Sequence, residues 1–244
     1  MRYLIVLLAA FLVAGTAHAQ ISYGGAQTPA VSAGIQLAQV DFSFVREGAP
    51  DASFNFSDPT YGIFYSRQGF NASFARGSSS LADGGDLILI DGTVSGWAGI
   101  RPFENSQDKK LDIFFPVGIS SDYRKVRKKD GDVDADIFEV TVLALGAGLG
   151  ATTGIRGSDL SIRAMPFYGL ASRSFGNDTG SSAVLTTNVE WASGSISDRF
   201  GIYFSYGYRW QQWNLNTSIV LDSEGKGDLT YEGSYHAIQI GLTF

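Results

Sequence analysis

The sequence predicts an all-β protein, a closed antiparallel transmembrane up-and-down β-barrel of about ten strands that spans residues 33–244. Three observations predict it. Apolar and polar residues alternate with period two in repeated stretches, which indicates strands with one apolar face. Clusters of Gly, Ser, Asn and Asp separate these stretches and mark turns. The chain of 244 residues has 30 glycines and only 17% charged residues, whereas soluble domains average about 25% charged residues.

The first residues predict export. Arg2 gives a positive start, residues 4–14 form an apolar run, and Ala-His-Ala at 17–19 is a small-x-small cleavage site, so residues 1–19 are expected to be a cleaved signal peptide. Residues 20–32 are small and polar without a period, and we expect a periplasmic N-terminal tail there. The sequence contains no cysteine, so no disulfide is expected.

The strands follow in order, and two reversals of the alternation define their limits. The reversal at residues 67–69 predicts a tight turn, because a slip of one residue turns every side chain to the other face. The reversal at Gln211 and Gln212 is interpreted as a bulge within one long strand, which reduces eleven candidates to ten. Eight or twelve strands stay open as alternatives. The candidates cover residues 38–44, 61–65, 70–74, 88–100, 113–119, 138–150, 160–170, 185–191, 200–210, 213–221 and 230–244.

The last candidate strand ends the sequence on an aromatic residue. Ile240, Leu242 and Phe244 fall on its apolar face. This strand resembles the terminal strand of Gram-negative outer-membrane β-barrel proteins. The resemblance implies a location in the cell outer membrane, among outer-membrane lipids and lipopolysaccharide. It also implies that these three residues form an assembly signal, and that periplasmic chaperones and the barrel-assembly machinery are partners during biogenesis.

Charged residues on the polar faces are expected to share the lumen. In a narrow barrel, opposite charges neutralise one another and fill the interior, whereas open aqueous channels belong to barrels of roughly sixteen strands. A structural or surface-interaction barrel with a plugged lumen is therefore predicted. A narrow channel or carrier for small or apolar solutes stays an alternative, as does a soluble periplasmic lipocalin-like barrel with its apolar faces inward. The expected lumenal residues are Asp41, Asp91, Asp112, Glu139, Arg163, Glu190 and Arg209.

The segment 124–136 is expected to be a charged hairpin tip on the extracellular side. Its acids and bases either pair within a solvated loop or leave the bases to contact lipopolysaccharide phosphates. The aspartates begin like a calcium loop, but Ala135 and Thr141 stand where that pattern has Gly and Glu, so no metal site is predicted. The basic residues are Arg124, Lys125, Arg127, Lys128 and Lys129.

Catalysis and cofactor binding are not indicated. Outer-membrane barrel enzymes such as lipid A deacylases, phospholipases and omptin-like proteases need a catalytic His near the rim. Beyond the signal peptide, His236 is the one histidine, and it falls on an apolar face without a partner, so a lipid-modifying rim enzyme is the weakest alternative. The Gly-rich segment 146–150 is not followed by a helix, so no dinucleotide cofactor is expected. A net charge of −6 argues against nucleic acid. The oligomeric state is left open.

Overall fold

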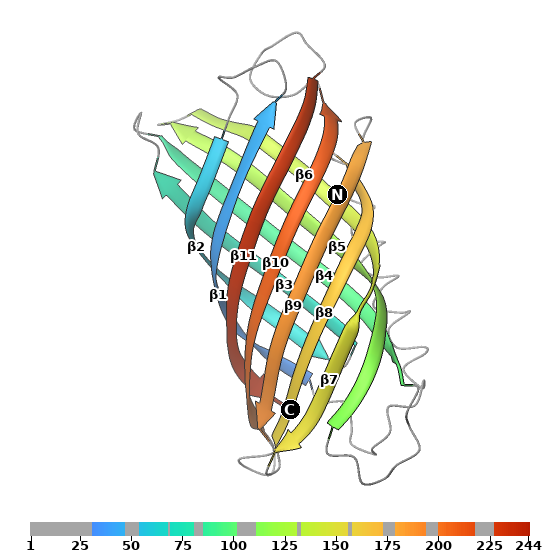
Figure 1. Ribbon diagram of the computed structural model, residues 1–244. Helices are drawn as coiled ribbons and strands as arrows, with labels where there is room; N and C mark the ends of the chain where they lie inside the picture. The colour runs from blue at the N-terminus through green and yellow to red at the C-terminus, as the bar shows by residue number, and fades with distance from the viewer. Residues whose placement is uncertain are drawn as a thin grey trace, which may run out of the picture.

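The computed structural model describes eleven strands of a single sheet (Figure 1). The described residues are 31–46, 54–67, 69–80, 85–101, 111–130, 133–155, 158–172, 179–193, 200–217 and 227–244. The predicted signal peptide, and the predicted tail as far as residue 30, lie outside these ranges. The strands are β1 (Val31–Arg46), β2 (Phe54–Arg67), β3 (Phe70–Ser80), β4 (Asp86–Ile100), β5 (Leu111–Asp130), β6 (Val133–Ala147), β7 (Leu149–Ile155), β8 (Ser158–Ser172), β9 (Thr179–Ser193), β10 (Gly201–Thr217) and β11 (Gly227–Thr243).

The sheet closes into a ring in which every strand pairing is antiparallel. β1 pairs with β11, and β4 pairs with β5, so no edge is left in the ring order β4-β3-β2-β1-β11-β10-β9-β8-β6-β5. β6 and β7 are separated by Gly148 alone, and both pair with β5 on one side and β8 on the other. The two share one position, so eleven strands occupy ten positions. The predicted closed barrel of about ten strands is confirmed.

The tight turn expected at residues 67–69 is present. β2 ends at Arg67, β3 begins at Phe70, and these two residues face each other in the register. Gly69 has a φ of 73°, a left-handed conformation that glycine adopts without steric cost. The reversal of the alternation at this point therefore reflects a real change of strand.

The second reversal has a different cause, and the predicted bulge was wrong. β10 pairs with β11 from Gly201 to Thr217 without a register shift. Up to Trp210 its large apolar side chains, with the exception of Tyr203, face outward, but beyond Gln211 the apolar Trp213 and Leu215 face inward and are buried. The strand continues unchanged while its apolar residues move from the outer face to the inner one.

The same exchange of faces occurs on other strands and divides the barrel into two halves. We define the lower half as the half that ends at Phe244. There the outer face is apolar, as in a membrane-spanning barrel. In β1, for example, Ile35 and Leu37 are exposed outside while Gln36 is buried inside. The exposed apolar residues of the lower half include Ile35, Leu37, Ile63, Tyr65, Ile113, Phe115, Leu145, Ile162, Phe204, Ile238, Ile240 and Leu242.

In the upper half the apolar residues are inside. Val40 and Phe42 of β1 are buried, while Gln39 and Asp41 face outward. We call the buried inner residues of this half the upper core; they are Val40, Phe42, Phe56, Leu87, Leu89, Val126, Val140, Val142, Val184, Trp213, Leu215 and Tyr231. The upper half thus has the pattern of a water-soluble barrel, with its polar face towards solvent. Among the described residues, no helix long and apolar enough to cross a membrane is found.

Candidate functional site

Four charged side chains meet in the lumen at the border between the two halves. We call Asp91, Asp122, Arg124 and Arg209 the charge cluster. All four are at least 93% buried, with exposed fractions of 2%, 1%, 2% and 7%. Each lies an even number of positions from buried residues on its own strand, β4, β5 or β10. Side chains at that spacing point to the same face, so all four point into the lumen. Two arginines and two aspartates balance each other's formal charge, which lowers the cost of burying them together.

The charge cluster joins opposite walls of the barrel. Arg209 Nη1 lies 2.7 Å from Asp122 Oδ1, and Arg209 Nη2 lies 2.9 Å from Asp91 Oδ2. Arg124 donates to Asp91 Oδ1 through Nε at 3.0 Å and Nη2 at 2.7 Å. Since β4 and β10 stand five places apart in the ring of ten, the Arg209–Asp91 pair spans the lumen.

Neutral polar groups also donate to both carboxylate oxygens of Asp122. Thr93 Oγ1 donates to Oδ1 at 2.9 Å, and Gln211 Nε2 donates to Oδ2 at 3.2 Å. Arg209 in turn donates to Thr93. These hydrogen bonds fix the geometry of the pair between Asp122 and Arg209.

Aromatic rings of the upper core enclose Arg124. Its Cζ lies 5.5 Å from the ring centre of Phe42, 5.7 Å from Trp213 and 5.6 Å from Tyr231, and Nη1 donates to the Tyr231 hydroxyl. Trp213 and Tyr231 stack with centroids 4.1 Å apart. Arg209 lies under the same layer, with Cζ 4.5 Å from the ring of Tyr235. The upper core and the charge cluster therefore form one continuous closure of the lumen.

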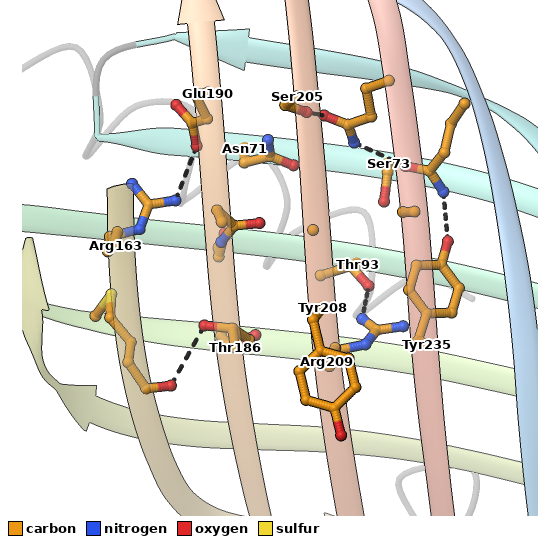
Figure 2. A pocket seen from close by; sticks show the side chains of 18 of the residues that line it. Asn71, Ser73, Thr93, Arg163, Thr186, Glu190, Ser205, Tyr208, Arg209 and Tyr235 are labelled. Atoms are coloured by element: carbon orange, nitrogen blue, oxygen red, sulfur yellow. Dashed lines mark hydrogen bonds and ion pairs between the residues drawn. The ribbon is translucent and has the colours of Figure 1, made fainter. Parts of the chain in front are cut away.

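A polar cavity of about 90 Å³ lies below this closure (Figure 2). A cavity of this size with polar walls has room for several waters. Figure 2 shows Arg163 of β8 and Glu190 of the neighbouring β9 pointing towards each other on one wall of the cavity, with Nη2 and Oε1 3.2 Å apart. Arg163 also stacks its Cζ 4.4 Å from the ring centre of Trp97.

A series of side-chain hydrogen bonds runs along another wall of the cavity. Ser205 Oγ donates to Gln239 Oε1 at 2.9 Å, and Gln239 Nε2 donates to Gln36 Oε1 at 2.7 Å. Gln36 then donates to the Tyr235 hydroxyl, which brings the series to the charge cluster. These neutral groups suit water or a neutral polar molecule.

Some of the residues expected in the lumen are there. Asp91 and Arg209 belong to the charge cluster, and Arg163 and Glu190 face the cavity. Asp112 has the inward parity of β5 but lies near its lower end, where it pairs with Arg101 at 2.9 Å and is 43% exposed. The lumenal charges therefore form separate groups at different depths.

Two residues expected in the lumen lie on the outer face, and that expectation was wrong. Asp41 faces outward and accepts a hydrogen bond from Ser57. Glu139 also faces outward, where it accepts from Tyr123 at 3.2 Å and pairs with Lys125 at 3.3 Å. Both belong to the upper half, where the polar face is the outer one.

The segment expected as a hairpin tip is mostly strand, so the extracellular loop proposed there was wrong in extent. β5 runs to Asp130 and β6 begins at Val133. Arg124 is not a surface residue but part of the charge cluster. Lys125 and Arg127 face outward on β5, where both pair with Asp136. Lys128 has the inward parity, and Lys129 is exposed.

Sequence reasoning missed Asp122 and Arg124 as lumenal residues. The signal was available, because both continue the even parity of Asp112, Phe114 and Ser120 along β5. Because the residues that follow Tyr123 are charged, they were interpreted as a loop, and the expected strand ended too early. A strand that leaves the membrane can continue with charges on its outer face.

His236 faces outward on β11. Its Nδ1 lies 2.8 Å from the Tyr206 hydroxyl, and its ring centre lies 4.9 Å from that of Tyr208. Among the described residues, neither a serine nor an acidic side chain hydrogen-bonds to His236. Within the same residues, no group of three or more His, Asp or Glu is placed to hold a metal ion.

Comparison with known proteins identifies similar folds only. No family model matches the chain, and no curated protein matches it. Among solved structures, the outer membrane protease OmpT from Escherichia coli is 9% identical with a TM-score of 0.45, covering 92% of this chain and 99% of its own. The outer membrane protein OprG from Pseudomonas aeruginosa is 11% identical with a TM-score of 0.40, covering 88% and 93%. The translocator domain of the autotransporter NalP from Neisseria meningitidis is 12% identical with a TM-score of 0.36, covering 99% and 98%.

The fold is established by the chain's own strand pairing. Ten strand positions close into a ring without an edge, and the lower half exposes apolar side chains around its outside. A closed ring satisfies every backbone hydrogen bond within the wall, which a membrane requires of any sheet that crosses it. The chain therefore folds as a closed antiparallel β-barrel whose lower half has the apolar exterior of a membrane-spanning wall.

Proposed function

We propose that this protein is an integral barrel of the outer membrane with a permanently closed lumen, and that its role is structural or one of surface interaction. The apolar exterior of the lower half fits the lipid core of a membrane. The polar exterior of the upper half fits water beyond that membrane. In this arrangement the upper wall projects outwards as a platform, and Val31 and Phe244, which pair at the lower end of the barrel, face the periplasm.

The proposal of a closed lumen rests on the charge cluster. Arg209 and Asp91 link opposite walls at 2.9 Å, and the upper core fills the space above them with buried rings and aliphatic groups. An ion that entered from the cavity would have to displace both layers. Since unpairing a buried charge costs several kcal/mol, an open state is strongly disfavoured (roughly 3–5 kcal/mol per broken pair).

Conductance in a planar bilayer tests the closed lumen. The folded protein is expected to give no steady current at neutral pH, while a porin of about sixteen strands inserted under the same conditions gives open-channel steps. A difference in gel migration between unboiled and boiled protein shows beforehand that the barrel is folded. A steady current from the folded barrel would overturn the proposal, and recovery of the protein as a soluble periplasmic species would overturn its membrane location.

We further propose that the barrel has no catalytic activity on lipids. His236 faces the outside of the wall, and its hydrogen-bond partner among the described residues is the Tyr206 hydroxyl, so it lacks the serine or carboxylate partner of a hydrolytic site. Hydrolysis of phospholipid and of lipid A should be absent from the purified protein. Activity that is present in the protein and lost in His236→Ala would contradict this.

A further inference from the structure

Three neighbouring strands carry a row of outward side chains at the border between the two halves. Tyr61 of β2 faces Arg76 of β3, and Arg76 faces Ile90 of β4. Tyr61 is 66% exposed, and Arg76 is exposed as well. Tyrosine and arginine side chains are typical of the level where a barrel wall meets lipid headgroups.

The row directly below is apolar and has a gap. Phe74 of β3 faces Gly92 of β4, which faces Tyr123 of β5. Phe74 is 52% exposed. A Cβ added to Gly92 would make only ordinary van der Waals contacts, at 4.0 Å from the Phe74 ring, the Ser73 carbonyl oxygen and Tyr123 Cβ, so a side chain fits at this position. The hydrogen bond from Tyr123 to Glu139 ties its hydroxyl to β6, on the side away from Phe74.

Arg76 differs from Lys125 and Arg127 on the same outer wall. Lys125 is held by Asp136 at 2.6 Å and Glu139 at 3.3 Å, and Arg127 is held by Asp136 at 3.1 Å. No acidic side chain among the described residues lies within ion-pair distance of Arg76. Its guanidinium therefore offers an uncompensated fork of donors to a phosphate, with the exposed Tyr61 hydroxyl beside it.

We propose that this outer surface binds a phosphorylated lipid of the outer leaflet. The phosphate sits against Arg76 and Tyr61, and an acyl chain descends along Phe74 over the gap at Gly92. The charge lies above the apolar row, which matches the order of headgroup and acyl chain along the membrane normal. This inference depends on the membrane location proposed above, and it concerns a different surface from the closed lumen.

Native mass spectrometry of the detergent-extracted full-length barrel, titrated with bis-phosphorylated lipid A, tests the site. Removing a charge-assisted hydrogen bond weakens binding by about tenfold or more, so Arg76→Gln should retain lipid A correspondingly less well. Gly92→Leu fills the gap without touching the lumen and should weaken retention similarly. The matched control is Arg67→Gln, which removes the same charge at the lower end of β2 and should bind like the unchanged protein.

Several results of these titrations would overturn the proposed lipid site. Equal retention by the unchanged protein and Arg76→Gln, or equal retention of lipid A with and without its phosphates, overturns the proposal. Arg76-dependent binding of inorganic phosphate without added affinity for the lipid also overturns it, because the acyl chain then contributes nothing. Heat-modifiable migration of every variant shows that the barrel is folded. A failure of the membrane location would instead appear as soluble protein before any lipid is added.

Discussion

Arg209 and Asp91, which are 118 residues apart in the chain, meet in the middle of the lumen with Nη2 and Oδ2 2.9 Å apart. Their strands, β10 and β4, stand on opposite walls of the ring. A contact of this kind ties the barrel together across its diameter, in addition to the hydrogen bonds around its circumference. The stability of the barrel should therefore depend on the charge cluster as well as on the wall.

Arg209→Met tests this dependence. The substitution preserves much of the side chain's length but leaves Asp122 buried without a cationic partner within the cluster. Breaking a buried pair by removing one partner costs about 3–5 kcal/mol, and we expect a loss of that size. Urea or guanidinium unfolding of the refolded barrel in detergent measures it. Arg163→Met is the matched control and should cost less, because its partner Glu190 is 24% exposed to the water of the cavity.

A double variant separates pairing from general damage. Arg209→Met combined with Asp122→Leu removes a charge of each sign, so the combined loss should fall short of the sum of the two single losses by roughly 0.5–3 kcal/mol. Additive losses would mean that the two side chains do not act as a pair, and would contradict the structure of the charge cluster.

Trp213→Ala tests the upper core. Trp213 is fully buried and stacks on Tyr231 with centroids 4.1 Å apart, so truncation leaves a cavity. Large-to-small changes of buried aromatic residues cost about 3–5 kcal/mol. Trp210→Ala, on the outer face of the same strand, is the comparison and should cost much less. Equal losses in the two variants, measured by the same unfolding titration, would mean that the upper half is not packed as described.

Gly148→Ala tests the junction of β6 and β7. The Gly148 amide donates to the Pro116 carbonyl at 2.8 Å, and an added Cβ would overlap the carbonyl oxygen of Ala164. We expect a reduced yield of heat-modifiable barrel on refolding. Gly154→Ala is the control, because its added Cβ has only Asp159 Oδ1 nearby at 3.9 Å. Equal yields for the two variants would show that the junction tolerates a side chain.

Phe244→Ala tests the assembly signal. Phe244 exchanges backbone hydrogen bonds with Val31 at 2.8 and 3.3 Å, and its side chain is 65% exposed. The substitution keeps the backbone hydrogen bonds to Val31, so the free energy of unfolding of the refolded protein should change by less than about 0.5 kcal/mol. Yield in the outer membrane of cells should fall severalfold. Ile202→Ala, an outward apolar residue on neighbouring β10, should leave the yield unchanged; an equal fall in both would argue against a terminal signal.

The sequence predicted the strands well and the lumen only in part. Alternation located the turn at Gly69 and the final strand, because these depend on neighbours along the chain. It assigned Asp91 and Arg209 to the lumenal face, but it could not show that they touch, since their contact arises from the closure of the ring. It placed Asp41 and Glu139 inside because it assumed that the apolar face is the outer face throughout.

By itself, the sequence predicted an antiparallel barrel and determined which residues share a face of a strand, since a period of two needs only the order of residues. The tertiary structure decided which face points inward. That choice depends on whether lipid or water lies outside a given level of the wall, and it reverses between Leu37 and Gln39 on β1 and beyond Trp210 on β10. The same closure brought Asp122 and Arg124 to the centre, where pairing with charges from other strands offsets part of the cost of burying each of them.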